Sequence, residues 1–332
     1  MAGGDGKDKK VEQTEYKFAT KPVEKTGWEG FTTFLWNSET SEFLGRTGMS
    51  WLKIGVFYII YYAFLAGFFM GMLWIFYQTL DMKEPRWLNS NGIIGSNPGV
   101  GFRPMPHTND IESTLVWFRH GEDNGNWEPW VERLEKFLKD YKNDTVTSDM
   151  VDRVECGELA SRPPGNNQIC KINREELFQG DCTAENHYGY KNGQPCILIK
   201  LNKIYGWVPE IYNVSKNNLP EKFPASIKKA MEENVKNDKD ALNNKVWIEC
   251  KGENPADVEN AGELIYYPDQ GVSANYFPYR NQGGYLSPAI FIQLTNPKKG
   301  VMIAIECKAY AQNIVHDSME RRGLAHFEVM ID

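Results

Sequence analysis

One long apolar segment divides the chain into two different parts. Residues 54–80 carry no charged side chain and are bracketed by Lys53 and Asp81. As a helix this segment would be about 40 Å long, enough to cross a bilayer whose hydrocarbon core is about 30 Å thick. The run begins too late and is too long for a cleaved signal peptide. We therefore expect an uncleaved signal anchor, that is, a transmembrane helix over residues 54–80.

Beyond this segment, shorter patterns predict a mainly β domain with one clear helix. Residues 81–105 are rich in glycine, proline and asparagine, which is typical of an extended stalk. Apolar positions in 128–142 recur every three to four residues and predict an amphipathic helix, and residues 221–238 repeat this pattern more weakly. β-branched or alternating runs predict strands at 197–201, 246–250, 289–295, 301–307 and 325–331. Short strands between turn residues favour an antiparallel sandwich, in which the turn at 296–300 would close a hairpin.

The segment before the apolar run has two parts of its own. Residues 1–26 are rich in lysine, glutamate and glycine and hold too few apolar positions to fold by themselves. Residues 27–50 carry large apolar side chains that suit docking on the membrane surface or on a partner, namely Trp28, Phe31, Phe34, Leu35 and Trp36. We therefore expect a tail over 1–53 that is largely disordered up to about residue 26.

Composition and charge exclude some classes of protein. The 332 residues are 24% charged and 41% hydrophobic, which disfavours both wholesale disorder and a multi-span membrane protein. The net charge is −7, and residues 1–53 hold eight basic and eight acidic side chains, so the net charge belongs to residues 81–332. Because a nucleic-acid-binding protein normally carries a basic face, we expect no nucleic-acid partner.

Cysteines and glycosylation motifs decide the orientation of the span. All six cysteines follow it, and so do both Asn-x-Ser/Thr motifs, at Asn143 and Asn213. An even cysteine set with such motifs is typical of an oxidising compartment outside the cytoplasm. Basic residues near the two ends of the span are balanced and decide nothing. The sequence therefore predicts a type II protein with a cytoplasmic tail at 1–53, a span at 54–80 and an extracellular domain at 81–332, whose stalk covers 81–105.

Motifs for catalysis or metal binding are scarce. The sequence has no Walker loop, no G-x-S-x-G, no H-E-x-x-H and no C-x-x-C motif, and its five histidines are isolated. Asp238 and Asp240 form an acid-x-acid pair that could hold a divalent metal on a nucleotide sugar, as in a type II Golgi glycosyltransferase. No α/β pattern surrounds the pair, and a solvated charge run explains it better. We therefore expect no catalytic residue, no metal and no cofactor.

The six cysteines are expected to form structural disulfides. None of them lies in the basic surroundings that activate a thiolate. Six cysteines allow fifteen pairings, and the sequence alone does not choose among them.

The apolar run also carries a signal for a partner helix. Ala63, Gly67 and Gly71 recur every four residues, and small residues let a second helix approach closely. Three tyrosine hydroxyls in the run need polar partners in a low-dielectric setting, those of Tyr58, Tyr61 and Tyr62. Plain anchoring explains these residues less well than packing on another membrane helix.

Several stretches together carry a family resemblance. They are Phe43-Leu-Gly-Arg-Thr-Gly48 with Ser50-Trp51, then Phe57-Tyr58 and Leu65-Ala66-Gly67, then Tyr188-Gly-Tyr-Lys191 with Pro195-Cys-Ile197, and Ile305-Glu-Cys-Lys-Ala-Tyr310. In this order they resemble the β subunit of the sodium/potassium-transporting P-type ATPase, from about residue 27 to the end of the chain. Residues 209–244 depart from the vertebrate pattern of that family.

The resemblance implies a fold and a disulfide pairing. In the family the extracellular domain is an immunoglobulin-like antiparallel sandwich with an inserted helix. Its disulfides join neighbouring cysteines, which here implies Cys156–Cys170, Cys182–Cys196 and Cys250–Cys307.

The resemblance also implies two contacts with a catalytic α subunit. In the membrane, the β span packs on the seventh and tenth α helices, which here assigns a contact to Tyr58, Tyr61, Tyr62, Gly67 and Gly71. Outside the membrane, an aromatic segment meets the loop between the seventh and eighth α helices. The matching residues here are Tyr276, Phe277, Pro278, Tyr279 and Tyr285.

The function implied is that of a non-catalytic subunit in the plasma membrane. It would support folding, assembly and delivery of the α subunit and modulate potassium and sodium transport, and a small single-span regulatory subunit is a further expected partner. ATP hydrolysis would belong to the α subunit. The alternatives are the β subunit of the potassium/proton pump, a type II Golgi glycosyltransferase and a cell-adhesion ectodomain.

Overall fold

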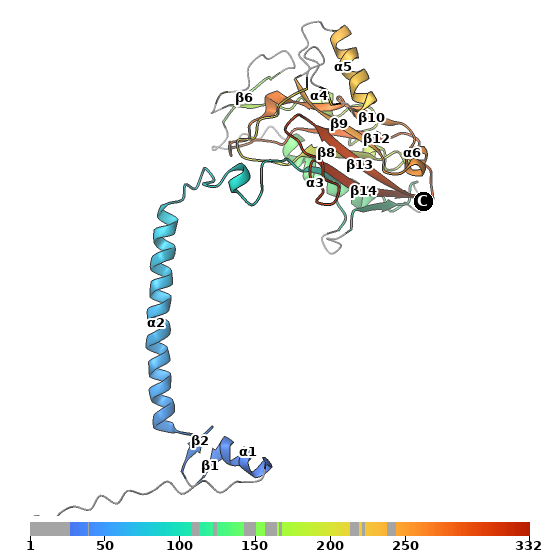
Figure 1. Cartoon of the computed structure of the whole chain (residues 1–332). Helices are drawn as coiled ribbons and strands as arrows, with labels where there is room; N and C mark the ends of the chain where they lie inside the picture. Colours follow the sequence, from blue (N-terminus) through green and yellow to red (C-terminus); the bar gives the residue numbers. More distant parts are fainter. Residues whose placement is uncertain are drawn as a thin grey trace, which may run out of the picture. The chain divides into compact units, whose positions relative to one another are not determined.

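The computed structural model describes residues 27–38, 40–107, 113–121, 125–142, 151–156, 165, 168–212, 219–220, 223–237 and 244–332. Its chain divides into two units, Met1–Leu80 and Asp81–Asp332. Figure 1 labels most of the helices and many of the strands of the two units.

The described residues of the first unit, 27–38 and 40–80, form a short helix, a small sheet and one long helix. Helix α1 covers Gly27–Leu35, and the antiparallel strands β1 (Trp36–Asn37), β2 (Glu42–Phe43) and β3 (Arg46–Thr47) follow it. Helix α2 then runs over Gly48–Gln78 without burying any of its side chains. It is long and apolar enough to cross a membrane. The helix begins six residues before the apolar run, because no proline interrupts the turn between Gly48 and Lys53.

The second unit is mainly β, as the sequence predicts. Its strands are β4 (Val100–Arg103), β5 (Leu115–Phe118), β6 (Asp152–Val154), β7 (Gln168–Cys170), β8 (Cys196–Leu201), β9 (Lys245–Gly252), β10 (Leu264–Tyr267), β11 (Gly271–Ser273), β12 (Ala289–Leu294), β13 (Met302–Tyr310) and β14 (Leu324–Ile331). Its helices are α3 (Glu128–Lys142), α4 (Arg174–Leu177), α5 (Ala225–Asn237) and α6 (Pro255–Ala261). Helix α3 has the bounds that the apolar spacing predicts.

Two sheets share one apolar core in this unit. One has the order β10-β12-β8-β4, and the other has the order β11-β9-β13-β14-β5. All pairs are antiparallel except β14 with β5. Along β13 buried and partly exposed residues alternate, as expected for a strand with one face on the core. Phe102 of β4 stacks on Phe327 of β14 with ring centroids 4.8 Å apart, which joins the two sheets.

The other face of the four-stranded sheet is covered as well. All six residues of β12 are buried, so both of its faces are out of contact with water. Phe291 of β12 meets Phe178 and Tyr188 at ring distances of 6.0 Å each. Helix α3 contributes to the same cover with Trp130, Val131, Leu134, Leu138 and Tyr141, which are all buried. This layer makes β12 a central strand rather than a half-exposed one.

A second, smaller core lies outside the five-stranded sheet. Trp247 of β9 points away from the main core and packs with Tyr212 and with Ile227 and Met231 of α5. The weak helical pattern predicted at 221–238 therefore forms a helix because Trp247 gives its apolar side chains something to cover.

Two sequence-based expectations differ from the structure. The predicted stalk at 81–105 ends in a core strand, β4, in which Val100 and Phe102 are buried. Because only these two residues of the strand point inward, the alternation of apolar and polar residues is too short to be recognised between the glycines. The predicted hairpin at 296–300 is wrong, because β12 pairs with β8 and β10 while β13 pairs with β9 and β14. That turn crosses from one sheet to the other, which requires the same turn residues as a hairpin.

Candidate partner-binding surfaces

Three of the tyrosines in the span, Tyr58, Tyr61 and Tyr62, form one aromatic face of α2. Tyr58 and Tyr62 stack with centroids 5.9 Å apart, and Tyr61 meets Tyr62 edge-on at 5.4 Å. Phe57 stacks on Tyr61 at 6.2 Å. About half of each tyrosine surface is exposed. The helix therefore offers a preformed aromatic face to a neighbour.

Gly67 and Gly71 lie on the opposite face of the span. A residue in an α-helix is turned by about 100° from the one before it, so Gly67, nine residues after Tyr58, is half a turn away from it. A Cβ atom on Gly67 or Gly71 would meet nothing within 4 Å, which leaves the backbone open to close approach. The predicted membrane contacts thus fall on two faces, and a single straight helix cannot cover both.

Some residues of the predicted extracellular contact are buried in the domain, and others are partly exposed on its surface. Phe277 and Tyr285 are 6% and 8% exposed, and Phe277 packs edge-on against Trp207 at 5.1 Å. Tyr276, Pro278 and Tyr279 are only partly buried. Because Tyr279 lies on Tyr285 with centroids 5.0 Å apart, the buried ring holds the more exposed one in place.

Sequence reasoning missed two residues that complete this aromatic cluster. The Lys203 ammonium lies 5.2 Å from the Tyr279 ring centroid and 5.3 Å from that of Tyr285, and it donates a hydrogen bond to the Tyr285 carbonyl. Tyr205 meets Tyr279 edge-on at 6.4 Å. Both residues follow β8, more than seventy residues before Tyr279, and only their alternation with Trp207 hints at a shared face.

An apolar groove continues from this cluster. Ile204 and Tyr205 form one wall, and residues 85–95 form the other, enclosing about 520 Å³. Its rim carries exposed side chains, with Trp87 53% and Ile94 79% exposed. Exposed apolar patches of this kind commonly mark interaction surfaces.

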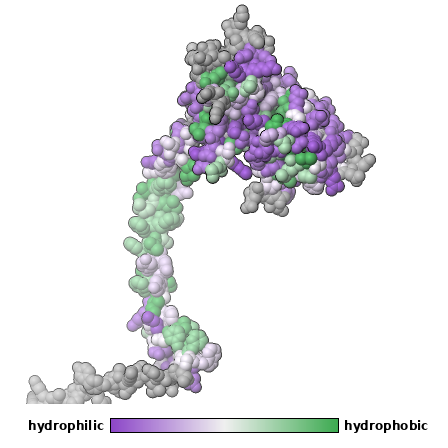
Figure 2. Space-filling view, turned by 45° about the vertical axis from the view of Figure 1, so that its right-hand side comes forward, coloured by the Kyte–Doolittle hydropathy of each residue, from purple (hydrophilic) through white to green (hydrophobic). Residues whose placement is uncertain are grey.

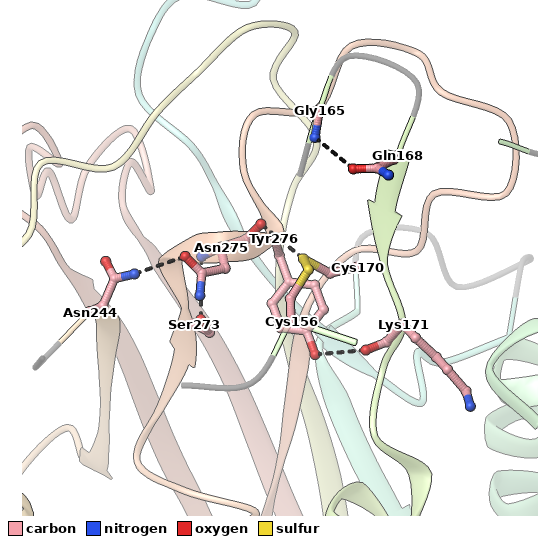
Figure 3. The surroundings of a disulfide bond; sticks show 9 residues. All are labelled: Cys156, Gly165, Gln168, Cys170, Lys171, Asn244, Ser273, Asn275 and Tyr276. Carbon is pink, nitrogen blue, oxygen red and sulfur yellow. Dashed lines mark hydrogen bonds between the residues drawn. A yellow bond between two sulfur atoms is a disulfide. The ribbon is translucent and has the colours of Figure 1, made fainter. Parts of the chain in front are cut away.

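Figure 3 shows how the Cys156–Cys170 disulfide supports the aromatic segment. The sulfur of Cys170 lies 3.1 Å from the carbonyl oxygen of Asn275, and the Tyr276 hydroxyl donates to the Lys171 carbonyl at 3.4 Å. Ser273 accepts a hydrogen bond from the Asn275 backbone. These contacts of Cys170 and Lys171 therefore connect the end of β7 to the start of the predicted contact segment.

The remaining cysteines join in the other two neighbouring pairs that the family resemblance implies. These are Cys182–Cys196 and Cys250–Cys307, and both lie in the main core. Cys250 and Cys307 are register partners at the centre of the five-stranded sheet.

Three cations crowd together at the edge of the four-stranded sheet. Burial, together with the charges of Arg103 and Lys203, lowers the pKa of Lys200 to about 8. Lys200 donates a hydrogen bond to the side-chain oxygen of Asn202. Burial also lowers the pKa of Lys203, and the nearby Asp140 carboxylate partly offsets this effect. Protonation of Lys200 is therefore less favourable in the folded state than in the unfolded chain.

We expect Lys200→Met to stabilise the chain at neutral pH by roughly 1 kcal/mol, a value kept small by the side chain's partial exposure to solvent. The unfolded chain holds the lysine proton up to about pH 10.5, so the stability of the natural chain should rise with pH above about 8. The variant should lack this rise. Denaturant unfolding of the full chain at pH 7 and 9.5 measures both effects, with Lys298→Met as an exposed control. An equal pH dependence in all three chains would contradict the expectation.

No metal cluster and no glycan site can be placed on the described parts of the chain. Among the described residues, no group of three or more His, Cys, Asp or Glu side chains could hold a metal ion. Asn143, Asn213, Asp238 and Asp240 lie outside the described residues.

Comparisons with known proteins agree on one family. The family model described as "Sodium / potassium ATPase beta chain" matches residues 21–329. Sodium/potassium-transporting ATPase subunit beta-2 of Drosophila melanogaster is 40% identical over 316 residues, covering 95% of this chain and 96% of the relative. Subunit beta-1 of the same organism is 35% identical over the full length of both chains. A probable subunit beta-3 of Caenorhabditis briggsae is 35% identical, covering 92% of this chain and 87% of the relative.

Proposed function

Since the chain belongs to the family of sodium/potassium ATPase β chains, we propose that it assembles with a catalytic α subunit and supports the folding and delivery of that subunit to the plasma membrane. The family, together with the single membrane-length apolar helix found among the described residues, indicates a single-pass membrane protein. The expectation of an accessory subunit is confirmed, and nothing favours a proton pump, a glycosyltransferase or an adhesion protein instead.

The proposed topology is type II, with residues 81–332 outside the cell. All six cysteines follow the span and are paired in three disulfides, which form and persist in oxidising compartments. The two asparagines of the glycosylation motifs, Asn143 and Asn213, would then be available for modification. In this proposal the two packed sheets with α3 on one face correspond to the family's immunoglobulin-like sandwich with an inserted helix.

The observation that carries the proposal is the pair of unpartnered faces on α2. The aromatic face of Tyr58, Tyr61 and Tyr62 and the open backbone at Gly67 and Gly71 each suit one neighbouring helix. Two separate faces fit the family expectation that the span packs on two α helices, the seventh and the tenth. A small single-span regulatory subunit would join the assembly elsewhere.

Outside the membrane, the aromatic cluster around Tyr279 is the proposed second contact. Tyr276, Pro278 and Tyr279 would face the loop between the seventh and eighth α helices, while the buried Phe277 and Tyr285 keep the segment rigid. Rigid aromatic side chains lose little entropy on binding, so they favour a stable interface. ATP hydrolysis and the ion sites belong to the α subunit in this proposal.

Paired substitutions in the span test this proposal. Tyr58→Ala with Tyr62→Ala, and separately Gly67→Leu with Gly71→Leu, should each lower co-purification of the α subunit about three- to thirtyfold, because contacts between membrane helices contribute roughly 0.6–2 kcal/mol. Ile59→Ala with Met70→Ala changes the arc between the two faces and should have little effect. Unchanged recovery in both test pairs would refute the two-face interface.

A further inference from the structure

Helix α1 exposes an apolar face that the proposed pump assembly does not use. Trp28, Phe31 and Leu35 follow one another at helical spacing and are 77%, 51% and 37% exposed. The opposite side of α1 carries Glu29 and Thr33. This division into an aromatic and a polar side is typical of helices that lie in a membrane interface.

The small sheet after α1 holds this helix at the N-terminal end of the span. The backbone N–H of Leu44 donates to the Leu35 carbonyl at 3.2 Å, and the Trp51 indole of α2 donates to the Phe43 carbonyl at 2.8 Å. The Phe43 and Trp51 rings lie 6.4 Å apart. Strand β3 then leads into α2 without a linker. The exposed face of α1 is therefore tied to the point where the membrane-spanning helix begins.

Phe34 strengthens this connection from the side of α1. Its ring lies beside Gly45, where a Cβ atom would come within 3.4 Å of it, and Gly45 has a positive φ of 68° that favours glycine. Helix α1 lies crosswise to α2 within this unit, as Figure 1 shows. Figure 2 shows apolar surface at the same end of the long helix.

We propose that α1 is a second membrane anchor, whose aromatic face lies in the headgroup region of the leaflet at the N-terminal end of the span. On the proposed topology this is the cytoplasmic leaflet. Tryptophan favours this region because its ring can lie among acyl chains while its N–H stays near water, and phenylalanine and leucine bury apolar area beside it. Helix α1 would then lie in the plane of the membrane surface and hold the span at a fixed depth.

Apolar burial rather than charge attracts α1 to the lipid. Residues 1–53 hold eight basic and eight acidic side chains, and α1 itself carries only Glu29. A basic segment would need anionic lipid and would detach in salt. Helix α1 has no such requirement, so it should bind zwitterionic phosphatidylcholine as well as mixtures with phosphatidylserine.

Site-specific photo-crosslinking tests the anchor in the full chain, assembled with its α subunit in phosphatidylcholine nanodiscs. A diazirine amino acid at position 31 should form lipid adducts at least fivefold more often than the same group at position 29, which lies about 160° around the helix. A diazirine at position 59 in the span serves as the positive control.

Each outcome of this experiment decides the proposal. Equal labelling at 31 and 29, or adducts at 31 with the α subunit instead of lipid, would overturn it. If lipid adducts are absent at both 31 and 59, the membrane placement of the whole chain is wrong. If they are absent at 31 but present at 59, only the proposed anchoring of α1 is wrong. As a second measurement, labelling at 31 should change less than twofold with 30% phosphatidylserine or 0.5 M salt, and a large loss in salt would contradict apolar anchoring.

Discussion

Replacing Cys250 and Cys307 together with serine is expected to prevent the chain from reaching the cell surface. Their disulfide closes a loop of 57 residues between two central strands, β9 and β13. In the chain-entropy model, losing such a link costs about 4 kcal/mol, which is a large part of the stability of an ordinary domain. Both cysteines are buried, so each serine would also bring a hydroxyl into an apolar core. Surface biotinylation and glycan maturation would measure the retention.

The matched control is Cys156→Ser with Cys170→Ser. This pair closes a loop of only 14 residues and lies outside the main core. Its loss should cost about 3 kcal/mol at most in the same model, and it should loosen Tyr276 rather than unfold the two sheets. We therefore expect partial surface delivery with weakened recovery of the α subunit. Equal retention of both double variants would show that the position of the link in the fold does not matter.

Gly189→Ala, which adds a single methyl group to the Tyr188–Tyr190 turn, is expected to destabilise the fold strongly. Gly189 has a φ of 73°, and a Cβ atom there would lie 2.0 Å from the carbonyl oxygen of Gln194. The same turn is closed by the hydrogen bond from the Gln194 N–H to the Gly189 carbonyl, so the backbone cannot move away easily. Strain and clash together should cost about 3 kcal/mol or more.

The strain introduced by Gly189→Ala would disturb the core, because both neighbours of Gly189 are fully buried tyrosines. Tyr188 contacts Phe291 and Tyr190 contacts Phe118, with centroids 6.0 and 5.0 Å apart. Gly193→Ala is the control: its φ is 70°, but the nearest atom to a new Cβ is 3.4 Å away, so only about 1 kcal/mol is expected. Denaturant unfolding of the full chain compares the two. Similar losses of stability would mean that backbone conformation, not the clash, is decisive.

Periodic apolar patterns predicted the long elements of this chain well. Residues 128–142 form α3 because four apolar side chains three or four residues apart, Val131, Leu134, Leu138 and Tyr141, pack against a sheet. The strands β4, β5 and β10 have four residues each, too few for alternation to stand out, and their pairing depends on distant partners. Turn residues at 296–300 indicated a reversal of the chain but could not tell a hairpin from a crossing between sheets.

The candidate contacts were predictable in part only. The family resemblance points to the aromatic segment at 276–279, but the burial of Phe277 and Tyr285 depends on Trp207 and Lys203, which no spacing connects to it. The opposite placement of Tyr58 and Gly67 follows from helix geometry alone. The glycine in the Tyr188–Tyr190 motif has a physical reason, a clash with Gln194, that appears only in three dimensions.

Co-expression with a P-type ATPase α chain, with and without this chain, tests the central claim most directly. The account predicts that the two chains co-purify from mild detergent and that sodium-dependent, potassium-stimulated ATP hydrolysis at the plasma membrane appears only with both. The purified chain alone should hydrolyse no ATP. Full α activity and delivery without this chain, and no co-purification with it, would contradict the account.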